Sequence, residues 1–360
     1  MWPFSRKVRR QLGVDIGTSS VKIVELENSD ASLRLSNYSI MDGSDFFGDT
    51  SGSNVPSGLK MSEDDIALAL RRLISEAKIK TTEAVMSIPI FSSFLTVMEL
   101  SNLTPKELEN AVPFEARSYI PVPLAEVVLD WLIIPPAPPP PSTTLTPSQK
   151  VTVLLIAVPK EVVSKYQRIA AAANLNLAAL ESESFSLARV LVGDNSGTVI
   201  LVDLGARNTN LTIVDRNFIF MSHSADLSGK EVTKIISRSL NITPSRAEEL
   251  KKTTGVAAAG ADKGLAQIIS PFIDKLINEV ERMDGLFFKK ENKKIEKMIL
   301  TGGAANLPGL AEYLSRRLGL AVIVGNSFSK IKFEPLLEQI FRRELSSGLA
   351  VAAGLAMRDL

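Results

Sequence analysis

The chain has 360 residues, of which 45% are hydrophobic and 22% are charged, and its formal net charge is +1. This length allows two ordinary domains or one large two-lobed domain, and the near-neutral charge gives no indication of nucleic-acid binding. The sequence contains no cysteine and a single histidine, His223. Disulfides, thiolate metal sites and cysteine nucleophiles are therefore excluded, and little basis remains for histidine catalysis or a His-rich metal site.

Residues 1–10 combine two aromatic side chains with four cations. They lack the apolar core of a signal peptide, and no apolar run in the chain approaches the ~20 residues that span a bilayer. We therefore expect a cytoplasmic protein. The segment 1–10 is expected to be a solvated tail, with a weak contact to a membrane surface or a partner as the alternative.

A first lobe is predicted over residues 11–89. Its apolar patterns predict strands over 11–16, 21–27, 32–40 and 83–88. A helix is predicted to begin after Ser62, since Asp65 completes a capping-box pattern. Between them, the stretch 41–58 is rich in Gly, Ser, Asp and Asn, which predicts a loop.

A different unit is predicted over residues 90–178. Strands are expected over 93–100, 127–134 and 151–158, and helices from Thr104-Pro105 and over 160–173. The proline-rich stretch 135–148 is expected to be an exposed, extended loop, because proline supports neither a helix nor a central strand.

The opening pattern then returns in a second lobe predicted over residues 179–345. Strands are expected over 197–203, 210–214, 218–224, 298–300 and 321–324, and helices over 230–239, 244–253, 263–288 and 308–318. A small-residue helix over 346–360 closes the chain. Three strands followed by helix–strand alternation thus occur twice, which predicts a duplicated α/β fold with an insertion in its first half.

The repeat extends to a short motif at the end of the first strand of each lobe. Asp15 and Gly17 are followed by Thr18, Ser19 and Ser20, and Asp203 and Gly205 are followed by Asn208, Thr209 and Asn210. One such motif is ordinary hairpin chemistry. Two copies that each open a three-strand block favour a pair of phosphate-binding hairpins, because glycine lets backbone N–H groups approach phosphate oxygens closely.

The charged residues of these motifs fit a nucleotide with its metal ion. Asp15 and Asp203 are candidates to hold hydrated Mg²⁺ through water, since this ion prefers carboxylates and retains waters. Lys22 is the candidate cation for the phosphates.

Two further stretches are candidates for binding adenosine. Residues 298–309 read as strand, glycine turn and helix, and Gly302, Gly303 and Asn306 are the candidates there; a plain strand-to-helix connection is the alternative. Glu248 and Lys251 lie three residues apart on one helical face and are candidates to reach the ribose and base, with a surface ion pair as the alternative.

These elements, in this order, resemble the actin-like ATPase superfamily. The resemblance implies two RNase H-like lobes, bound ATP with Mg²⁺, and a phosphate-contacting lysine seven residues after the first aspartate, which is the spacing of Asp15 and Lys22. Two departures from the superfamily pattern, Arg207 in the second hairpin and Lys230 after Ser228-Gly229, favour nucleotide binding over efficient hydrolysis. At most a slow ATPase is expected.

A longer string narrows the resemblance. The segment from Glu115-Ala116 through Tyr119-Ile120-Pro121 is similar to a signature of the PilM family, cytoplasmic actin-like components of type IV pilus assembly. That likeness implies a scaffold with an inserted subdomain that binds the N-terminal tail of a PilN-like bitopic inner-membrane protein, and hence a position at the inner face of the membrane. Tyr119, Ile120 and Pro121 are the candidate groove residues. An FtsA-like division protein and a sugar or acetate-type kinase are the alternatives.

Overall fold

The fold is described from a computed structural model, for residues 8–29, 32–42, 62–101, 103–136, 150–193, 197–256, 263–341 and 345–360. The predicted loop from residue 43 onward, residues 1–7 of the predicted tail and residues 137–148 of the proline-rich stretch lie outside this range. None of the helices among the described residues has the length and the apolar composition that a membrane span requires.

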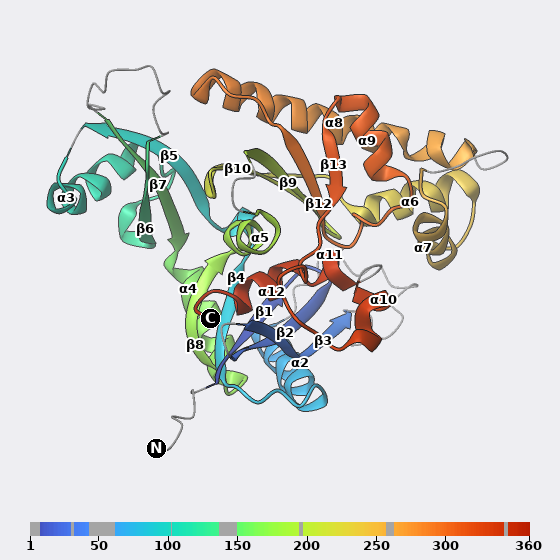
Figure 1. The fold of residues 1–360 in the computed structure, drawn as a ribbon, viewed down its shortest axis with the longest axis horizontal. Coiled ribbons are helices and arrows are strands. Elements are labelled where there is room, and N and C mark those ends of the chain that lie inside the picture. Colours follow the sequence, from blue (N-terminus) through green and yellow to red (C-terminus); the bar gives the residue numbers. More distant parts are fainter. Residues whose placement is uncertain are drawn as a thin grey trace.

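The first lobe is built on a five-stranded sheet, at the bottom of Figure 1. In spatial order its strands are β3 (Ser32–Asp42), β2 (Ser20–Ser29), β1 (Arg9–Ile16), β4 (Glu83–Ile88) and β8 (Asn176–Ser182). The first three strands are antiparallel neighbours, whereas β1–β4 and β4–β8 are parallel pairs. Because β1 and β4 are parallel neighbours, their C-terminal ends lie side by side at the same edge of the sheet.

Helices cover both faces of this sheet. On one face, α2 (Glu63–Glu76) and α4 (Lys160–Ala172) pack together over an apolar core that includes Leu12 and Val14 of β1. Ser62 caps α2 and forms the predicted capping box with Asp65. On the other face, α12 (Ala350–Ala356) contacts β1, β2 and β4.

The second lobe repeats this sheet. Its strands are, in spatial order, β11 (Phe218–Ala225), β10 (Thr209–Asp215), β9 (Thr198–Leu204), β12 (Lys297–Thr301) and β13 (Ala321–Val324). Again three antiparallel strands are followed by two parallel ones. The same strand order and directions in both lobes agree with the duplication predicted from the sequence.

The helices of the second lobe are α6 (Gly229–Leu240), α7 (Pro244–Thr253), α8 (Lys263–Glu291) and α9 (Leu310–Leu318). The start of α9 differs from the prediction of residue 308, because Gly309 has φ +77° and caps the helix in a left-handed conformation. The short helix α10 (Glu338–Ile340) follows the 3₁₀ turn Pro335–Leu337.

A separate three-stranded antiparallel sheet carries the inserted unit, at the upper left of Figure 1. Its order is β5 (Phe94–Ser101), β7 (Lys150–Pro159) and β6 (Val127–Ile134), with α3 (Pro105–Glu115) packed on it. Short 3₁₀ turns occupy Ile90–Ser92, Ala116–Ser118 and Leu124–Glu126. Residues 160–178, which the sequence analysis grouped with this unit, pack on the first sheet as α4 and the start of β8.

Two helices join the lobes. The predicted helix over 346–360 is divided at Leu349 into α11 (Ser346–Gly348) and α12. The helix α5 (Glu183–Leu191), which the sequence analysis did not predict, follows β8 directly and packs against both α12 and β11. The largest apolar core runs through this junction, since it includes Leu187 of α5, Leu355 of α12 and Val202 of β9.

Candidate functional site

The first predicted hairpin joins β1 to β2. Asp15 lies opposite Lys22 in the strand register, and the Lys22 Nζ lies 3.4 Å from Asp15 Oδ2. Ser87, near the end of the adjacent parallel strand β4, donates a hydrogen bond of 3.1 Å to the other carboxylate oxygen. Asp15 is buried, and the cation of Lys22 and the hydroxyl of Ser87 compensate its carboxylate for the loss of water.

The turn of this hairpin exposes backbone. Gly17 donates its N–H to the Ser20 carbonyl at 3.0 Å, which closes the turn, and residues 17–20 are all partly exposed. Within the part of the chain that the structure describes, the N–H groups of Thr18 and Ser19 make no backbone hydrogen bond. They are available to an anion.

The second predicted hairpin joins β9 to β10 with the same register. Asn210 lies opposite Asp203, as Lys22 lies opposite Asp15. Gly205 donates its N–H to the carbonyls of Asp203 and Asn208, both at 3.1 Å. A Cβ at Gly205 would lie 2.7 Å from the Asn208 carbonyl oxygen, so this tight turn requires glycine.

The two hairpins converge between the lobes. Burial raises the pKa of Asp203 to about 6. The positive charge of Lys22 lowers this pKa, whereas the negative charge of Asp15 raises it further. A hydrogen bond from the Asn210 side chain also lowers it. Because Lys22 and Asp15 belong to the other lobe, their influence on Asp203 shows that the strand ends of both lobes meet here.

A third carboxyl, Glu183, lies at the same place. It is the first residue of α5, is buried, and accepts a hydrogen bond of 3.1 Å from Asn210 Nδ2. Burial, then the charges of Asp15 and Asp203, raise its pKa well above the ordinary value. We refer to Asp15, Glu183 and Asp203 as the carboxylate cluster. No role in the site was predicted for Glu183 from the sequence, because neither β8 nor α5, whose junction places this residue between the lobes, was predicted.

Two of the predicted phosphate residues have their side chains engaged within the second lobe. Thr209 is buried, and its hydroxyl donates to the Leu227 carbonyl at 2.9 Å. Asn208 donates from Nδ2 to the Ser224 hydroxyl at 2.7 Å. These side chains shape the hairpin, so a contact with phosphate at these positions would come from the backbone.

The glycine turn after β12 lies against the second hairpin. Gly302 has φ +85°, and a Cβ there would collide with Oδ1 of Asp203 and lie 2.7 Å from the Leu204 carbonyl oxygen. Gly303 is exposed and has open space where a side chain would be. Asn306 is exposed as well and donates to the Ser347 hydroxyl at 2.8 Å. The turn thus places backbone without side chains beside Asp203.

Glu248 and Lys251 form the predicted pair on α7, with an Nζ–Oε2 distance of 2.6 Å. Lys251 is only 7% exposed, and its ammonium also donates to the Gly229 carbonyl at 3.1 Å and the Thr233 hydroxyl at 2.9 Å. All three of its protons therefore have acceptors within the lobe. Burial lowers the pKa of Lys251, although Glu248 opposes this. Lys251 fastens α7 to α6, and Glu248 is the more accessible member of the pair.

The two residues that depart from the superfamily pattern add positive charge near the second hairpin. Lys230 donates its backbone N–H to the Ala206 carbonyl at 3.2 Å, beside Arg207. Burial and the charges of Arg207 and Lys234 lower the pKa of Lys230, while Asp42 and Glu248 raise it. Asp42 belongs to the first lobe, so this cationic group also lies where the lobes approach each other.

In the described part of the chain, the carboxylate cluster does not have the geometry of a direct metal site. Among the described residues, no group of three or more His, Cys, Asp or Glu side chains has the geometry to hold a metal ion. Two aspartates with a lysine between the lobes instead fit a hydrated Mg²⁺ bound through its waters.

The predicted groove residues differ in accessibility. Tyr119 is 46% exposed and Pro121 is exposed, whereas Ile120 is 7% exposed and belongs to the core of the inserted unit. The side chain of Ile120 therefore supports this surface from below, and only its two neighbours are accessible to a partner.

Comparison with known proteins identifies the family. The family model described as type IV pilus assembly protein PilM matches residues 13–360. A solved PilM-PilN type IV pilus biogenesis complex has a chain that is 27% identical, with a TM-score of 0.77 and coverage of 97% of this chain and 98% of that one.

More distant solved structures share the fold. The ethanolamine utilization protein EutJ of Carboxydothermus hydrogenoformans is 17% identical, with a TM-score of 0.56 and coverage of 99% of this chain and 90% of that one. MreB5 of Spiroplasma citri bound to AMPPNP is 12% identical, with a TM-score of 0.53 and coverage of 98% and 95%. The fold is therefore the actin-like fold predicted from the sequence, and the chain belongs to the PilM family of type IV pilus assembly proteins.

Proposed function

We propose that this protein is an ATP- and Mg²⁺-binding scaffold of the type IV pilus assembly machinery. One observation carries the nucleotide part of the proposal: the two glycine hairpins, one from each lobe, bring Asp15, Lys22 and Asp203 within electrostatic reach of one another. This is the arrangement that a chain of phosphates with a hydrated cation requires. The family match over residues 13–360 favours this function over the FtsA-like and kinase alternatives.

Each part of the arrangement has a role in this proposal. The N–H groups of Thr18 and Ser19 and the ammonium of Lys22 bind phosphate oxygens, and Asp15 and Asp203 bind Mg²⁺ through water. The backbone at Gly302-Gly303 receives the nucleoside in this proposal, and Asn306 and Glu248 are its further contacts.

The state of Glu183 supports binding with slow hydrolysis. Burial and two neighbouring carboxylates favour its protonated form. The same causes disfavour the carboxylate form that a general base requires. We accordingly propose that turnover is slow and that the bound state matters more than the chemistry.

The partner in this proposal is the N-terminal tail of a PilN-like bitopic inner-membrane protein. Support comes from the PilM-PilN complex, whose matched chain aligns with 97% of this one. Through that tail the protein would be held at the inner face of the membrane while remaining cytoplasmic. Tyr119 and Pro121, which are exposed beside α3, are the proposed contact residues.

Calorimetry with Mg-ATP tests the nucleotide site. Asp15→Ala removes a carboxylate of the site and should abolish binding while the circular dichroism spectrum is unchanged. Asp64→Ala, which removes an exposed carboxylate from α2, is the matched control and should bind as the parent does. An unchanged affinity for Asp15→Ala would refute the proposed site.

A pull-down with the partner's N-terminal tail tests the scaffold role. A peptide of that tail should retain the protein, and a peptide of the same composition in scrambled order should not. Failure to bind both with and without Mg-ATP would overturn the partner assignment and leave the nucleotide site to be judged by calorimetry alone.

A further inference from the structure

The helix α5 carries Glu183 at its first turn and is fixed at that end to the second lobe. Besides the bond from Asn210 to Glu183, the hydroxyl of Ser184 lies 3.1 Å from that of Ser222 and accepts a hydrogen bond of 3.2 Å from Thr212. Ser222 lies on β11 and Thr212 lies on β10. The N-terminal turn of α5 is thus bound to the second sheet, in which Asp203 lies at the end of β9.

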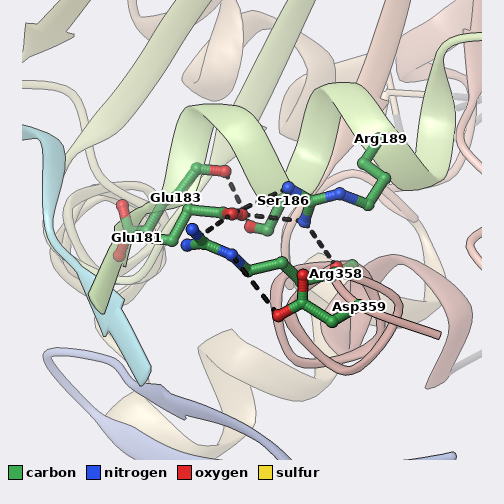
Figure 2. A network of polar contacts seen from close by, with 7 residues as sticks. Glu181, Glu183, Ser186, Arg189, Arg358 and Asp359 are labelled. Atoms are coloured by element: carbon green, nitrogen blue, oxygen red, sulfur yellow. Dashed lines mark hydrogen bonds and ion pairs between the residues drawn. The ribbon is translucent and has the colours of Figure 1, made fainter. Parts of the chain in front are cut away.

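About one and a half turns later, α5 is fixed to the first lobe by Arg189. Its guanidinium makes two parallel bonds to Glu181, at 2.8 and 2.7 Å, and donates a third to the Gly354 carbonyl of α12 at 2.7 Å. Figure 2 shows Arg189 reaching from α5 toward the C-terminal segment, where Arg358 adds a 3.3 Å contact to the same Glu181. A bidentate arginine–carboxylate pair of this kind restricts both distance and orientation.

Backbone packing makes this attachment rigid. A Cβ on Gly354 would collide with the Ser186 carbonyl of α5, and a Cβ on Gly13 of β1 would collide with the Ala352 carbonyl of α12. The helix α12 therefore lies in backbone contact with α5 on one side and with β1 on the other. Because β1 leads to Asp15 and α5 begins at Glu183, this stack links two members of the carboxylate cluster.

We propose that Arg189 is a positioning residue for the nucleotide site: by fastening α5 to Glu181 and to the Gly354 carbonyl, it sets the position of the Glu183 carboxyl between Asp15 and Asp203. This inference rests on the proposed nucleotide binding. Arg189 itself touches neither hairpin in the interactions above and acts through the helix.

The chain offers a closely matched control. Arg216 also pairs with a buried carboxylate, Asp215, and also donates to a backbone carbonyl, that of Pro135 at 2.9 Å. The side-chain exposures of the two pairs are nearly the same, 28% and 8% for Arg189–Glu181 against 29% and 5% for Arg216–Asp215. Arg216 lies at the opposite end of β10 from the hairpin of Asp203, so it has no path to the carboxylate cluster through α5.

The test compares Arg189→Met, Arg189→Lys and Arg216→Met by thermal unfolding and by Mg-ATP calorimetry. Both methionine variants should lose a similar amount of melting temperature. Only Arg189→Met should bind Mg-ATP more weakly, by about tenfold, and Arg189→Lys, which keeps one charged bond, should recover part of that loss. An affinity for Arg189→Met within twofold of the parent, or an equal loss in Arg216→Met, would overturn the positioning role.

A second measurement separates this inference from the proposed function. If the parent protein binds no Mg-ATP, the proposed function fails. Hydrogen exchange of the nucleotide-free protein then tests whether Arg189 holds the N-terminal turns of α5 in place. The positioning role requires faster amide exchange over residues 183–187 in Arg189→Met than in Arg216→Met. Equal exchange in the two variants would overturn it.

Discussion

Replacement of Asp203 by asparagine should make the nucleotide-free protein more stable at neutral pH. Burial raises the pKa of this carboxyl from 3.8 to about 6, so the folded state disfavours its charge. Asparagine has the same shape, keeps an acceptor for the Asn210 amide and carries no charge to desolvate. The variant therefore removes an electrostatic cost that the parent protein carries.

The size of the effect follows from that shift. A difference of about two pKa units at about 1.36 kcal/mol per unit corresponds to about 3 kcal/mol. A carboxyl whose folded-state pKa is raised stabilises the fold fully below its unfolded pKa, and this contribution is lost as the pH rises through the folded pKa. The gain of Asp203→Asn over the parent should therefore be near zero below pH 4, grow between pH 4 and 6, and level off above pH 6. Glu183, whose pKa Asp203 also raises, should titrate together with it.

Urea unfolding in EDTA at a series of pH values measures this gain without bound cation. Asp215→Asn is the control, since Asp215 lies at the other end of the same β9–β10 hairpin. Burial opposes the charge of Asp215 as well, but hydrogen bonds from Lys293, Arg216 and Thr198 outweigh it and lower its pKa. The control should thus lose stability at neutral pH. If Asp203→Asn is no more stable than the parent at pH 8, its carboxylate is not desolvated and the reasoning is wrong.

Three other substitutions, one of them with its own control, have expected outcomes. Gly354→Val places side-chain atoms against the Ser186 carbonyl and should cost about 3 kcal/mol or more in urea unfolding, whereas Gly348→Ala, with open space at its Cβ, should stay within about 0.5 kcal/mol of the parent. Lys251→Met removes the ammonium that donates to the Gly229 carbonyl, the Thr233 hydroxyl and Glu248, and should cost about 2 kcal/mol in the same assay; no loss would mean that the lysine does not fasten α7. Tyr119→Ala should weaken tail-peptide binding in a fluorescence titration with the melting temperature unchanged, and equal affinity would place the groove elsewhere.

The sequence allowed the duplicated sheets to be predicted because their strands are regular and apolar. The predicted strand over 197–203 is β9 (Thr198–Leu204), and the Asp-x-Gly motifs lie at the ends of β1 and β9, as expected. Strand pairing then places each aspartate seven residues before its partner, so the spacing of Asp15 and Lys22 is a direct consequence of a two-stranded register. Such local patterns can be recognised from the sequence alone.

The junction between the lobes was not predictable in the same way. The strand β8 alternates weakly between polar and apolar residues and lies at the edge of its sheet, and α5 follows it with no side-chain cap to mark its start. Without these two elements, Glu183 reads as one of two acidic residues in the string Glu181-Ser182-Glu183. Its role depends on contacts with residues far away in sequence, such as Asn210, which only the fold supplies.

The two hairpins differ in the residue that lies opposite the aspartate. At the position where the first hairpin has Lys22 opposite Asp15, the second has Asn210 opposite Asp203. An amide donates a hydrogen bond but supplies no positive charge, so the desolvation of Asp203 is offset mainly by Lys22 of the other lobe. The Asp203 carboxyl of the second lobe consequently depends on a cation that the first lobe supplies. Because Lys22 also lies 3.4 Å from Asp15, one ammonium group acts on a carboxylate in each lobe.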